Sequence, residues 1–377
     1  MNLKLAYLSQ GKLFVKDGDA APRQIESHFG KEVVERALRA HQKNEWKTKK
    51  KDSPFSGSML WGVNETDPRA TRVHATGMSR SNQDGSMYFM LEMETTGGLF
   101  LYNYQKNTER RLFHKESFRS GDLDWHPEHN LIVGAQYFPN GTANLIMMNA
   151  EGRELCQITE GDSVDEAPSW IPDKTRQIVF QSAGVARDQK GYAVGTGPFA
   201  IEKIDLEKKS LTTIQEDPNY DFLLPHFTST GALYYIRRPY EMPGATKYSP
   251  LQFLTDFLLF PFRLLRAIFH YLNFFSVVYS QKPLTTASGP KIAGEDEQTL
   301  RLRGRIIDAK KTLREAGNKE EAPSLVPKTW ELVQRSPNGA ERVVAKGVVA
   351  FDIGADRRII YTIGNAVYQF DESVKSQ

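Results

Sequence analysis

The 377-residue chain lacks several features that commonly indicate a function. It has one cysteine, Cys156, which excludes a disulfide framework and a zinc site built from several cysteines. Its 49 Lys and Arg residues against 46 Asp and Glu residues leave a net charge of +3, too balanced for a dedicated nucleic-acid binder. A mean hydropathy of −0.50 argues against a polytopic membrane protein. The 40% of hydrophobic residues nevertheless suffices for a sizeable folded core.

The first residues also lack the uninterrupted apolar stretch of about 7–15 residues that a secretory signal needs. Lys4, Ser9 and Lys12 interrupt every apolar run in this part of the chain. The segment predicts two short strands instead. We therefore expect a cytoplasmic protein.

A repeat is the most informative feature that is present. Each unit has a strand ending in a large apolar residue, a turn, two apolar strands and a polar outer strand. The large residues that mark the units are Met78, Trp125, Trp170, Phe227 and Phe351. Four short strands every 40–50 residues or so are typical of propeller blades. The sequence predicts an all-β fold, a β-propeller of six blades whose ends close the ring, with five or seven blades as alternatives.

Two runs carry a resemblance to a known family. Residues 165–173, Asp-Glu-Ala-Pro-Ser-Trp-Ile-Pro-Asp, and residues 149–159, which end in Ile-Thr, resemble the TolB-type WD-like β-propeller repeat. The match is looser where phenylalanine replaces the tryptophan and where Lys174 replaces a glycine. The resemblance implies the propeller fold. Related peptidases add a hydrolase domain with a Gly-x-Ser-x-Gly motif, and this sequence contains no such motif.

Two insertions interrupt the predicted propeller. The predicted parts are strands in 1–26, a helical insertion in 27–60, blades in 61–243, a second helical insertion in 244–326 and the last strands in 327–377. In the first insertion, apolar spacing predicts a helix over 31–43. It runs into a basic end, Lys49, Lys50 and Lys51, which is either a solvated helix end or a patch for anionic lipid.

The second insertion contains an apolar segment, residues 251–278. At helical spacing its polar residues, with Arg263 and Arg266 among them, fall within about 100° of one face. The other face carries Phe253, Phe257, Leu258, Phe260, Leu264, Leu265, Phe269, Leu272 and Phe275. This face can lie in a membrane interface with the arginines at headgroup level, dock on a partner or second copy, or pack on its own propeller. Residues 298–316 predict a second, basic amphipathic helix.

Candidate chemistry is sparse. Asp122, Asp165 and Asp221 lie near the start of predicted inner strands, which line the channel of a propeller. They can hold a cation or a basic peptide there, or cap turns through side-chain hydrogen bonds. Some lyases on TolB-like propellers use histidines around a divalent ion, which draws attention to His126 and His226. Ordinary turn histidines are the alternative, and we predict no metal and no cofactor.

The leading hypothesis is a non-enzymatic scaffold or adaptor for protein–protein interaction. Its 251–278 segment would attach it to a partner or, as a peripheral protein, to the inner face of a membrane. Nucleic acid is not an expected partner. The alternatives are a propeller enzyme, such as a metal-dependent lyase or hydrolase with a channel site, and a sugar- or peptide-binding module.

Overall fold

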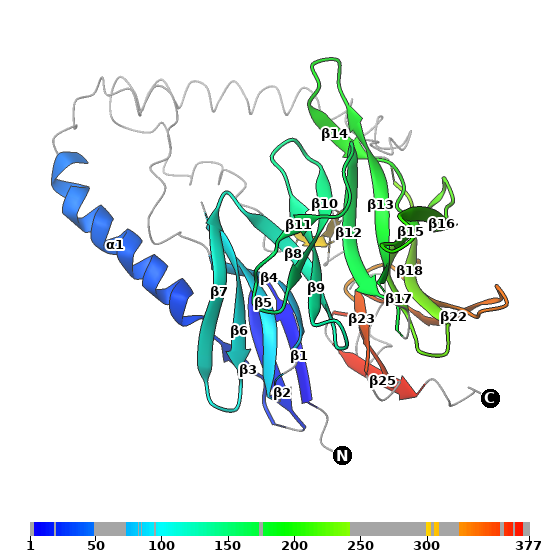
Figure 1. The fold of residues 1–377 in the computed structure, drawn as a ribbon, viewed down its shortest axis with the longest axis horizontal. Coiled ribbons are helices and arrows are strands. Elements are labelled where there is room, and N and C mark those ends of the chain that lie inside the picture. Colours follow the sequence, from blue (N-terminus) through cyan, green and yellow to red (C-terminus); the bar gives the residue numbers. More distant parts are fainter. Residues whose placement is uncertain are drawn as a thin grey trace, which may run out of the picture.

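A computed structural model describes most of the chain. The described residues are 4–18, 20–48, 73–81, 83, 85–93, 96–172, 176–241, 299–302, 305–308, 324–354, 358–364 and 366–371. Within them the chain forms 25 strands and one helix, α1 (Figure 1). Almost every strand pairs antiparallel with a neighbour in sequence, as the repeat predicts for an all-β protein.

The first two sheets come from the N-terminal third of the chain. One has three strands in the order β1-β2-β3 and the other has four in the order β4-β5-β6-β7. Their bounds are β1 Lys4–Ser9, β2 Lys12–Asp17, β3 Arg23–Ile25, β4 Val73–Arg80, β5 Ser86–Met93, β6 Thr96–Asn103 and β7 Thr108–Glu116.

Two further four-stranded units form the middle of the molecule. The unit β8-β9-β10-β11 joins the unit β12-β13-β15-β16 through a parallel pairing of β10 with β12, and β14 extends from β13. Their bounds are β8 Arg119–His126, β9 Leu131–Tyr137, β10 Ala143–Asn149, β11 Cys156–Gln157, β12 Ser163–Trp170, β13 Gln177–Arg187, β14 Ala193–Thr196, β15 Ala200–Asp205 and β16 Ser210–Gln215.

The last two large sheets are β17-β18-β21-β22 and β23-β24-β25. Strand β18 pairs directly with β21, so everything between them in sequence is an insertion between neighbouring strands of one sheet. The bounds are β17 Tyr220–Phe227, β18 Leu233–Pro239, β21 Glu331–Arg335, β22 Glu341–Lys346, β23 Ala350–Ile353, β24 Arg358–Thr362 and β25 Val367–Asp371.

The predicted basic helix over 298–316 is wrong for its first half. Residues Thr299–Leu302 (β19) and Arg305–Asp308 (β20) form an antiparallel hairpin. Only two residues, the second of them Gly304, separate the strands, which is a hairpin connection that glycine favours. The alternation Leu-Arg-Leu-Arg over 300–303 has the period of a strand.

Helix α1, His28–Thr48, includes residues 31–43, for which the sequence predicts a helix. The Ser27 hydroxyl caps its start by accepting a hydrogen bond from the Gly30 amide at 3.0 Å. Phe29 anchors it to the second sheet, since its ring lies 5.3 Å from that of Phe100. None of the described helices is long and apolar enough to cross a membrane.

Each sheet packs face to face on the next because its second strand is apolar at consecutive positions. In β5, Phe89 packs toward the first sheet while Met90 packs toward the third. In β13, Ile178 and Phe180 face the unit before, and Val179 faces the sheet after. Side chains alternate between the two faces of a strand, so such a run fills two interfaces at once.

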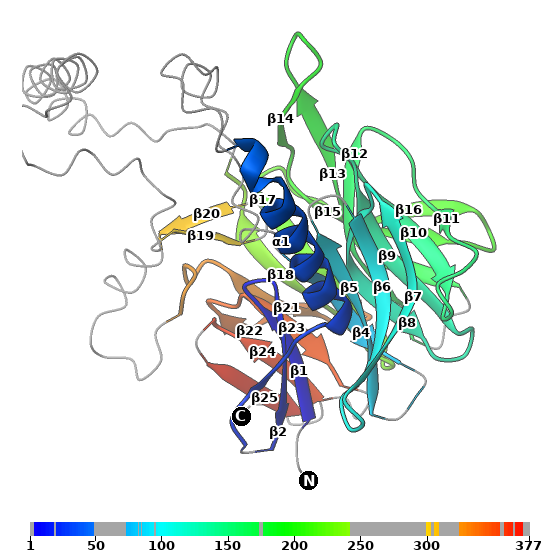
Figure 2. The same ribbon diagram turned by 90° about the vertical axis from the view of Figure 1, so that its left-hand side faces the viewer.

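The innermost strands β4, β8, β12, β17 and β23 pack side by side in chain order. The first and last sheets, β1–β3 and β23–β25, lie next to each other in both views (Figures 1 and 2). A bulge recurs in four innermost strands, β4, β8, β12 and β17, where the register shifts shortly before Met78, Trp125, Trp170 and Phe227. Three bulges hold a non-glycine residue in the left-handed region: Asp122 (φ 50°), Ala167 (φ 49°) and Leu224 (φ 55°).

Candidate functional site

A group of charged side chains lies where the innermost strands come together. Asp124 of β8 and His226 of β17 each precede the large residue that ends their strand. Arg80 ends β4, and Asp352 follows Phe351 in β23. We call Arg80, Asp124, His226 and Asp352 the axial cluster. Its four members come from four different sheets.

Asp124 is the centre of this cluster. Its Oδ2 atom accepts hydrogen bonds from the Trp170 amide at 2.8 Å and from the Ser169 hydroxyl at 3.3 Å. Both donors belong to β12, so the carboxylate ties β8 to the next innermost strand. Asp124 thus adds a carboxylate to the axial cluster and also hydrogen-bonds β8 to β12.

Burial raises the pKa of Asp124 above its ordinary value. The charge of His226 and the hydrogen bond from Trp170 oppose this rise, Asp352 adds to it, and Arg80 opposes it again. Each of these groups is therefore close enough for its charge to act on Asp124. A carboxyl group whose pKa burial raises is a candidate for proton transfer or for binding a cationic group.

Arg80 and Asp352 form the open side of the cluster. Their side chains are 54% and 70% exposed, and Arg80 Nη2 lies 4.0 Å from an Asp352 oxygen. Arg80 also donates to the Ile353 carbonyl oxygen. The His226 ring packs edge-on against Phe351, with 5.4 Å between ring centres, and its Nδ1 lies 3.2 Å from the Leu224 carbonyl oxygen. Two exposed groups of opposite charge thus stand beside two less exposed ones.

The three predicted channel acids are not equivalent in the structure. Asp122, Asp165 and Asp221 lie three, five and six residues before Trp125, Trp170 and Phe227, at different positions of their strands. Asp122 is a bulge residue that accepts from the Tyr137 hydroxyl at 3.2 Å. Asp165 accepts from the Ser182 hydroxyl at 2.7 Å. All three carboxylates make hydrogen bonds within the sheets.

Asp221 has the most tightly held carboxylate of the three. It is buried and accepts from Arg238 Nε at 2.8 Å and from the Phe199 amide at 3.1 Å. The Arg238 guanidinium also stacks over the Trp330 ring at 4.7 Å. This arrangement joins β17 and β18, the first two strands of one sheet, to Phe199 just before β15 of the preceding unit, and it serves the fold.

Of the two predicted histidines, only His226 belongs to the axial cluster. His126 is buried, and its Nδ1 accepts from the Glu128 and His129 amides at 3.2 and 3.3 Å. Its ring packs edge-on against Trp170 at 5.1 Å. Among the described residues, no group of three or more His, Cys, Asp or Glu side chains could hold a metal ion.

The remaining predicted contact residues lie outside the described residues. These are the apolar face from Phe253 to Phe275, the arginines Arg263 and Arg266, and the lysines Lys49, Lys50 and Lys51. They stay predictions from the sequence.

Sequence reasoning missed Arg80, Asp124 and Asp352. One signal was available, because the residue before each large strand-ending residue is polar in three units: Asp124, Ser169 and His226. Arg80 and Asp352 follow Met78 and Phe351 in sequence. Spacing alone therefore does not place them at the position of Asp124 and His226, which precede their large residues. Their proximity follows from how the strands meet at the axis.

The arrangement of the sheets identifies the fold. Repeated antiparallel sheets packed face to face, with innermost strands side by side, give the chain the fold of a β-propeller. No protein-family model and no curated relative matches the chain.

Solved structures similar in fold include propeller proteins. TolB from Acinetobacter baumannii has a TM-score of 0.44 and 8% identity over 93% of this chain and 53% of its own. The tricorn protease has a TM-score of 0.47 and 12% identity over 97% of this chain and 32% of its own. Oligogalacturonate lyase from Vibrio parahaemolyticus has a TM-score of 0.41 and 10% identity over 99% of this chain and 76% of its own. The chain thus spans about half the length of that TolB.

Proposed function

We propose that the chain is a six-bladed propeller that acts as a non-enzymatic scaffold and binds a protein partner at its axial cluster. The six blades would be the two three-stranded sheets at the ends and the four four-stranded units between them. The single observation that carries the binding role is the axial cluster itself. Four ionisable side chains from four sheets meet there, and two of them are exposed.

The chemistry of the cluster suits a peptide segment with a basic side chain. Asp124 and Asp352 offer two carboxylates to a cation, while Arg80 and His226 can pair with a peptide carbonyl or an acidic neighbour. The structural use of His126, Asp165 and Asp221 supports a binding role over catalysis, because these candidate groups already hold turns and strands together.

Attachment to a membrane belongs to the same proposal. The apolar face of 251–278 would lie in the interface of the inner, cytoplasmic membrane surface. The place of this segment in the chain supports the role, since it leaves from one sheet between β18 and β21 and need not disturb the strands on either side.

The experiment is affinity capture with the full chain and two sets of variants. Asp124→Asn combined with Asp352→Lys changes the axial cluster, and Phe257→Asp combined with Leu265→Asp changes the apolar segment. Leu211→Asp, at an exposed outer-strand position, is the matched control. We expect the axial variant alone to lose the protein partners, and the segment variant alone to lose membrane association. Identical captured proteins for all variants would refute the axial binding role.

One observation favours a second candidate, a ligand-binding or hydrolytic site at the same cluster. Burial raises the pKa of Asp124, and the charge of His226 acts on the same carboxyl group, so the cluster would place a carboxyl group and an imidazole where a bound sugar or peptide would lie. A pure binding site and a catalytic one differ in the behaviour of Asp124→Asn. In a binding module that variant would change ligand affinity alone, whereas in an enzyme it would also abolish turnover of the ligand that still binds.

A further inference from the structure

The most prominent surface element outside the axial cluster is a two-stranded arm. Strand β13 pairs with β12 only up to Gly184 and then continues with β14 as a separate hairpin. Residues 185–196 form this arm, which projects beyond the other described strands (Figures 1 and 2). None of the other units extends its second strand in this way within the described residues.

The arm is held rigidly at its base. Arg187 Nε donates to both carboxylate oxygens of Asp162 at 2.9 Å, and its Nη1 donates to the Asn140 carbonyl oxygen at 3.1 Å. The Tyr240 hydroxyl donates to the Thr196 carbonyl oxygen at 2.7 Å. These bonds tie the base of the arm to Asp162, Asn140 and Tyr240 and so restrain its direction.

The tip is also ordered by its own hydrogen bonds. The Asp188 carboxylate accepts from the Lys190 and Tyr192 amides, each at 2.9 Å. Gly191, with φ of +82°, makes the turn between them. A fixed turn of this kind loses little conformational freedom when it meets a surface.

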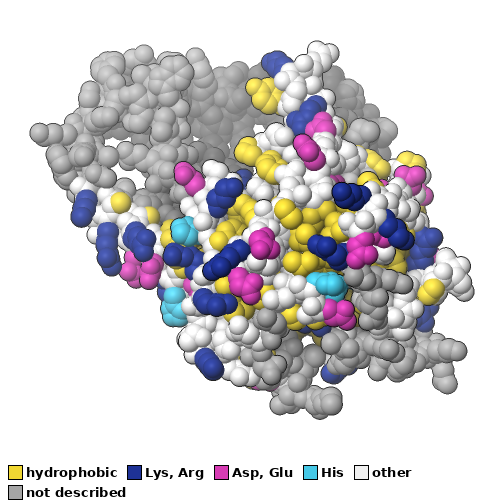
Figure 3. Space-filling model, in the orientation of Figure 1, with side chains coloured by type: hydrophobic (Ala, Val, Ile, Leu, Met, Phe, Trp, Pro, Cys, Tyr) yellow, Lys and Arg dark blue, Asp and Glu magenta, His cyan; other side chains and the backbone are white. Residues whose placement is uncertain are grey.

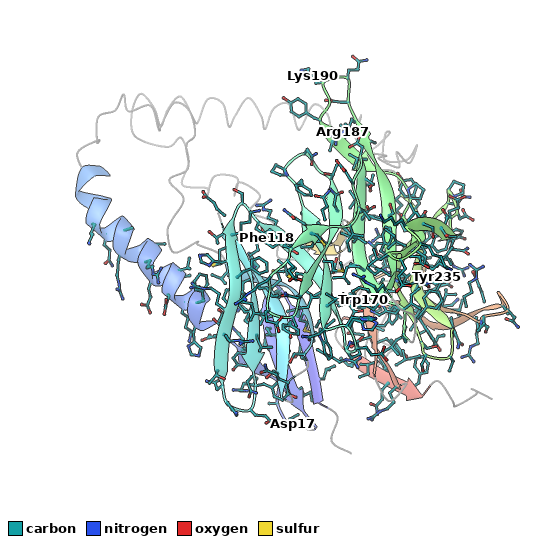
Figure 4. The ribbon with its side chains drawn as sticks, in the orientation of Figure 1. Asp17, Phe118, Trp170, Arg187, Lys190 and Tyr235 are labelled. Atoms are coloured by element: carbon teal, nitrogen blue, oxygen red, sulfur yellow. The ribbon has the colours of Figure 1, made fainter. Side chains whose placement is uncertain are left out.

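This tip presents exposed apolar side chains, Lys190, and the Asp188 carboxylate that accepts from two backbone amides. Tyr192 is 69% and Val194 is 58% exposed, the most exposed large hydrophobic pair that the described residues place on one element. Lys190 extends from the very end of the arm, and Arg187 lies nearer the body (Figure 4). The aromatic and aliphatic residues beside a lysine form the pattern of a membrane-interface contact.

The direction of the arm points to the kind of partner. Tyr240, which bonds to Thr196 at the base of the arm, lies one residue before Glu241, the last described residue before the insertion. The 251–278 segment begins ten residues after Glu241. Ten extended residues span at most about 35 Å. The end of α1, which leads in sequence to Lys49–Lys51, and the arm are both directed toward the upper side of the molecule in both views.

The shape of the tip favours lipid over protein. A stable protein interface covers about 800 Å² on each partner with close complementarity, and a two-residue convex tip does not offer that area. A bilayer interface needs no matching surface and accepts a small apolar tip directly. The space-filling view shows hydrophobic, basic and acidic atoms on the projecting arm (Figure 3).

We infer that the tip of the β13–β14 arm, with Lys190, Tyr192 and Val194, is a second contact with an anionic lipid surface. This inference rests on the proposed membrane attachment of the chain. The arm and the 251–278 segment would contact the same membrane, and the rigid arm would fix how the propeller is tilted on it.

The test uses flotation of the full chain with phosphatidylcholine vesicles, with and without phosphatidylserine. We expect Tyr192→Asp combined with Val194→Asp to weaken partition about tenfold, since two apolar groups are replaced by charges. Leu211→Asp, with a leucine that is 62% exposed on β16, is the control and should leave partition unchanged. Thermal unfolding checks that the exposed replacements leave the fold intact.

A spectroscopic readout reports on the arm itself. Val194→Cys in a Cys156→Ser background carries one polarity-sensitive dye, because Cys156 is the chain's single cysteine. Its emission should shift to the blue on vesicles containing phosphatidylserine. A dye at Gln369→Cys on β25 should not shift.

Two results would overturn the inference and can be told apart. If Phe257→Asp with Leu265→Asp abolishes partition while the arm variant retains it and the dye at 194 stays unshifted, the arm is not a lipid contact, although the proposed attachment stands. If the wild-type chain binds no vesicle and the dye at 194 shifts only with a protein partner, both the inference and the membrane part of the proposed function fail.

Discussion

The contacts between successive sheets differ in kind from the link between the second sheet and the last. Five apolar clusters join each sheet to the one after it. The first and last sheets lie side by side (Figure 2), and there Arg80, from the second sheet, reaches the exposed Asp352 and the Ile353 carbonyl of the last. The described residues thus contain apolar interfaces between neighbours in sequence and a polar bridge near the closure.

The third strands of two sheets also differ in how far they are buried. In the β17–β22 sheet the third strand is buried, with Leu332 and Val333 fully covered by their surroundings. In the last sheet the third strand is β25, where Val367 is 53% and Tyr368 is 40% exposed. We expect the buried interfaces between the middle sheets to contribute more to stability than the more exposed β23–β25 sheet.

The largest effect is expected in a middle interface. Phe180→Ala should lower the free energy of unfolding by about 3–5 kcal/mol, because Phe180 is buried between two units and its removal leaves a cavity. Tyr368→Ala, an aromatic truncation on the exposed β25, should cost less than about 1 kcal/mol. Urea unfolding measures both. Equal costs for the two variants would contradict the comparison.

The next effect concerns the buried ion pair. Arg238→Met should cost about 3 kcal/mol, because the buried Asp221 loses its counter-ion while its other partner, the Phe199 amide, remains. Adding Asp221→Asn should recover most of this loss, since the amide oxygen still accepts from Phe199. Urea unfolding of the single and double variants decides. A double variant no more stable than the single one would show that the arginine acts through its stacking on Trp330.

A smaller effect, of opposite sign, is expected at the axis. The folded-state pKa of Asp124 is raised above its ordinary value of 3.8, so folding binds a proton more tightly there. Stability from this group is greatest at low pH and decreases as the pH rises toward the folded-state pKa. Asp124→Asn should therefore raise the melting temperature near pH 7 and leave it unchanged near pH 3. A lower melting temperature at both pH values would mean that the carboxylate is needed for the hydrogen bonds to β12.

The smallest global effect is expected for Arg80→Ala. Its side chain is more than half exposed, so the ion pair with Asp352 contributes under about 1 kcal/mol. The local effect should be clear, because the β23–β25 sheet loses its link to β4. Hydrogen exchange should speed up in β23–β25 and stay unchanged in β9 and β13. Arg119→Ala, which removes another exposed pair with Glu92, is the control and should not change exchange in β23–β25.

Much of the fold could be predicted from the sequence, and the reasons are local. Trp125 and Trp170, 45 residues apart, mark equivalent strand ends, and the apolar runs after them became the doubly buried second strands. The helix predicted over 298–316 is wrong at its start because the apolar residues there suit two periods, and the sequence has a glycine between the two strands.

The site was harder to predict because it is made of distant parts. Arg80 and Asp352 are 272 positions apart and come together only through the order of the strands around the axis. The three predicted aspartates share a rough location in sequence, but a difference of one residue moves a side chain to the other face of a strand. His226 alone was both predicted and found in the axial cluster.

The bulges in the innermost strands bear on how such repeats diverge. An aspartate, an alanine and a leucine occupy the same left-handed backbone position in three units, three residues before Trp125, Trp170 and Phe227. The backbone angle at this position is therefore maintained by the surrounding packing and does not require glycine, the residue that adopts it most readily. Mutation can thus replace the amino acids of a unit and leave its bend in place. Over long descent, such a repeat persists as a shape after its sequence motif has faded.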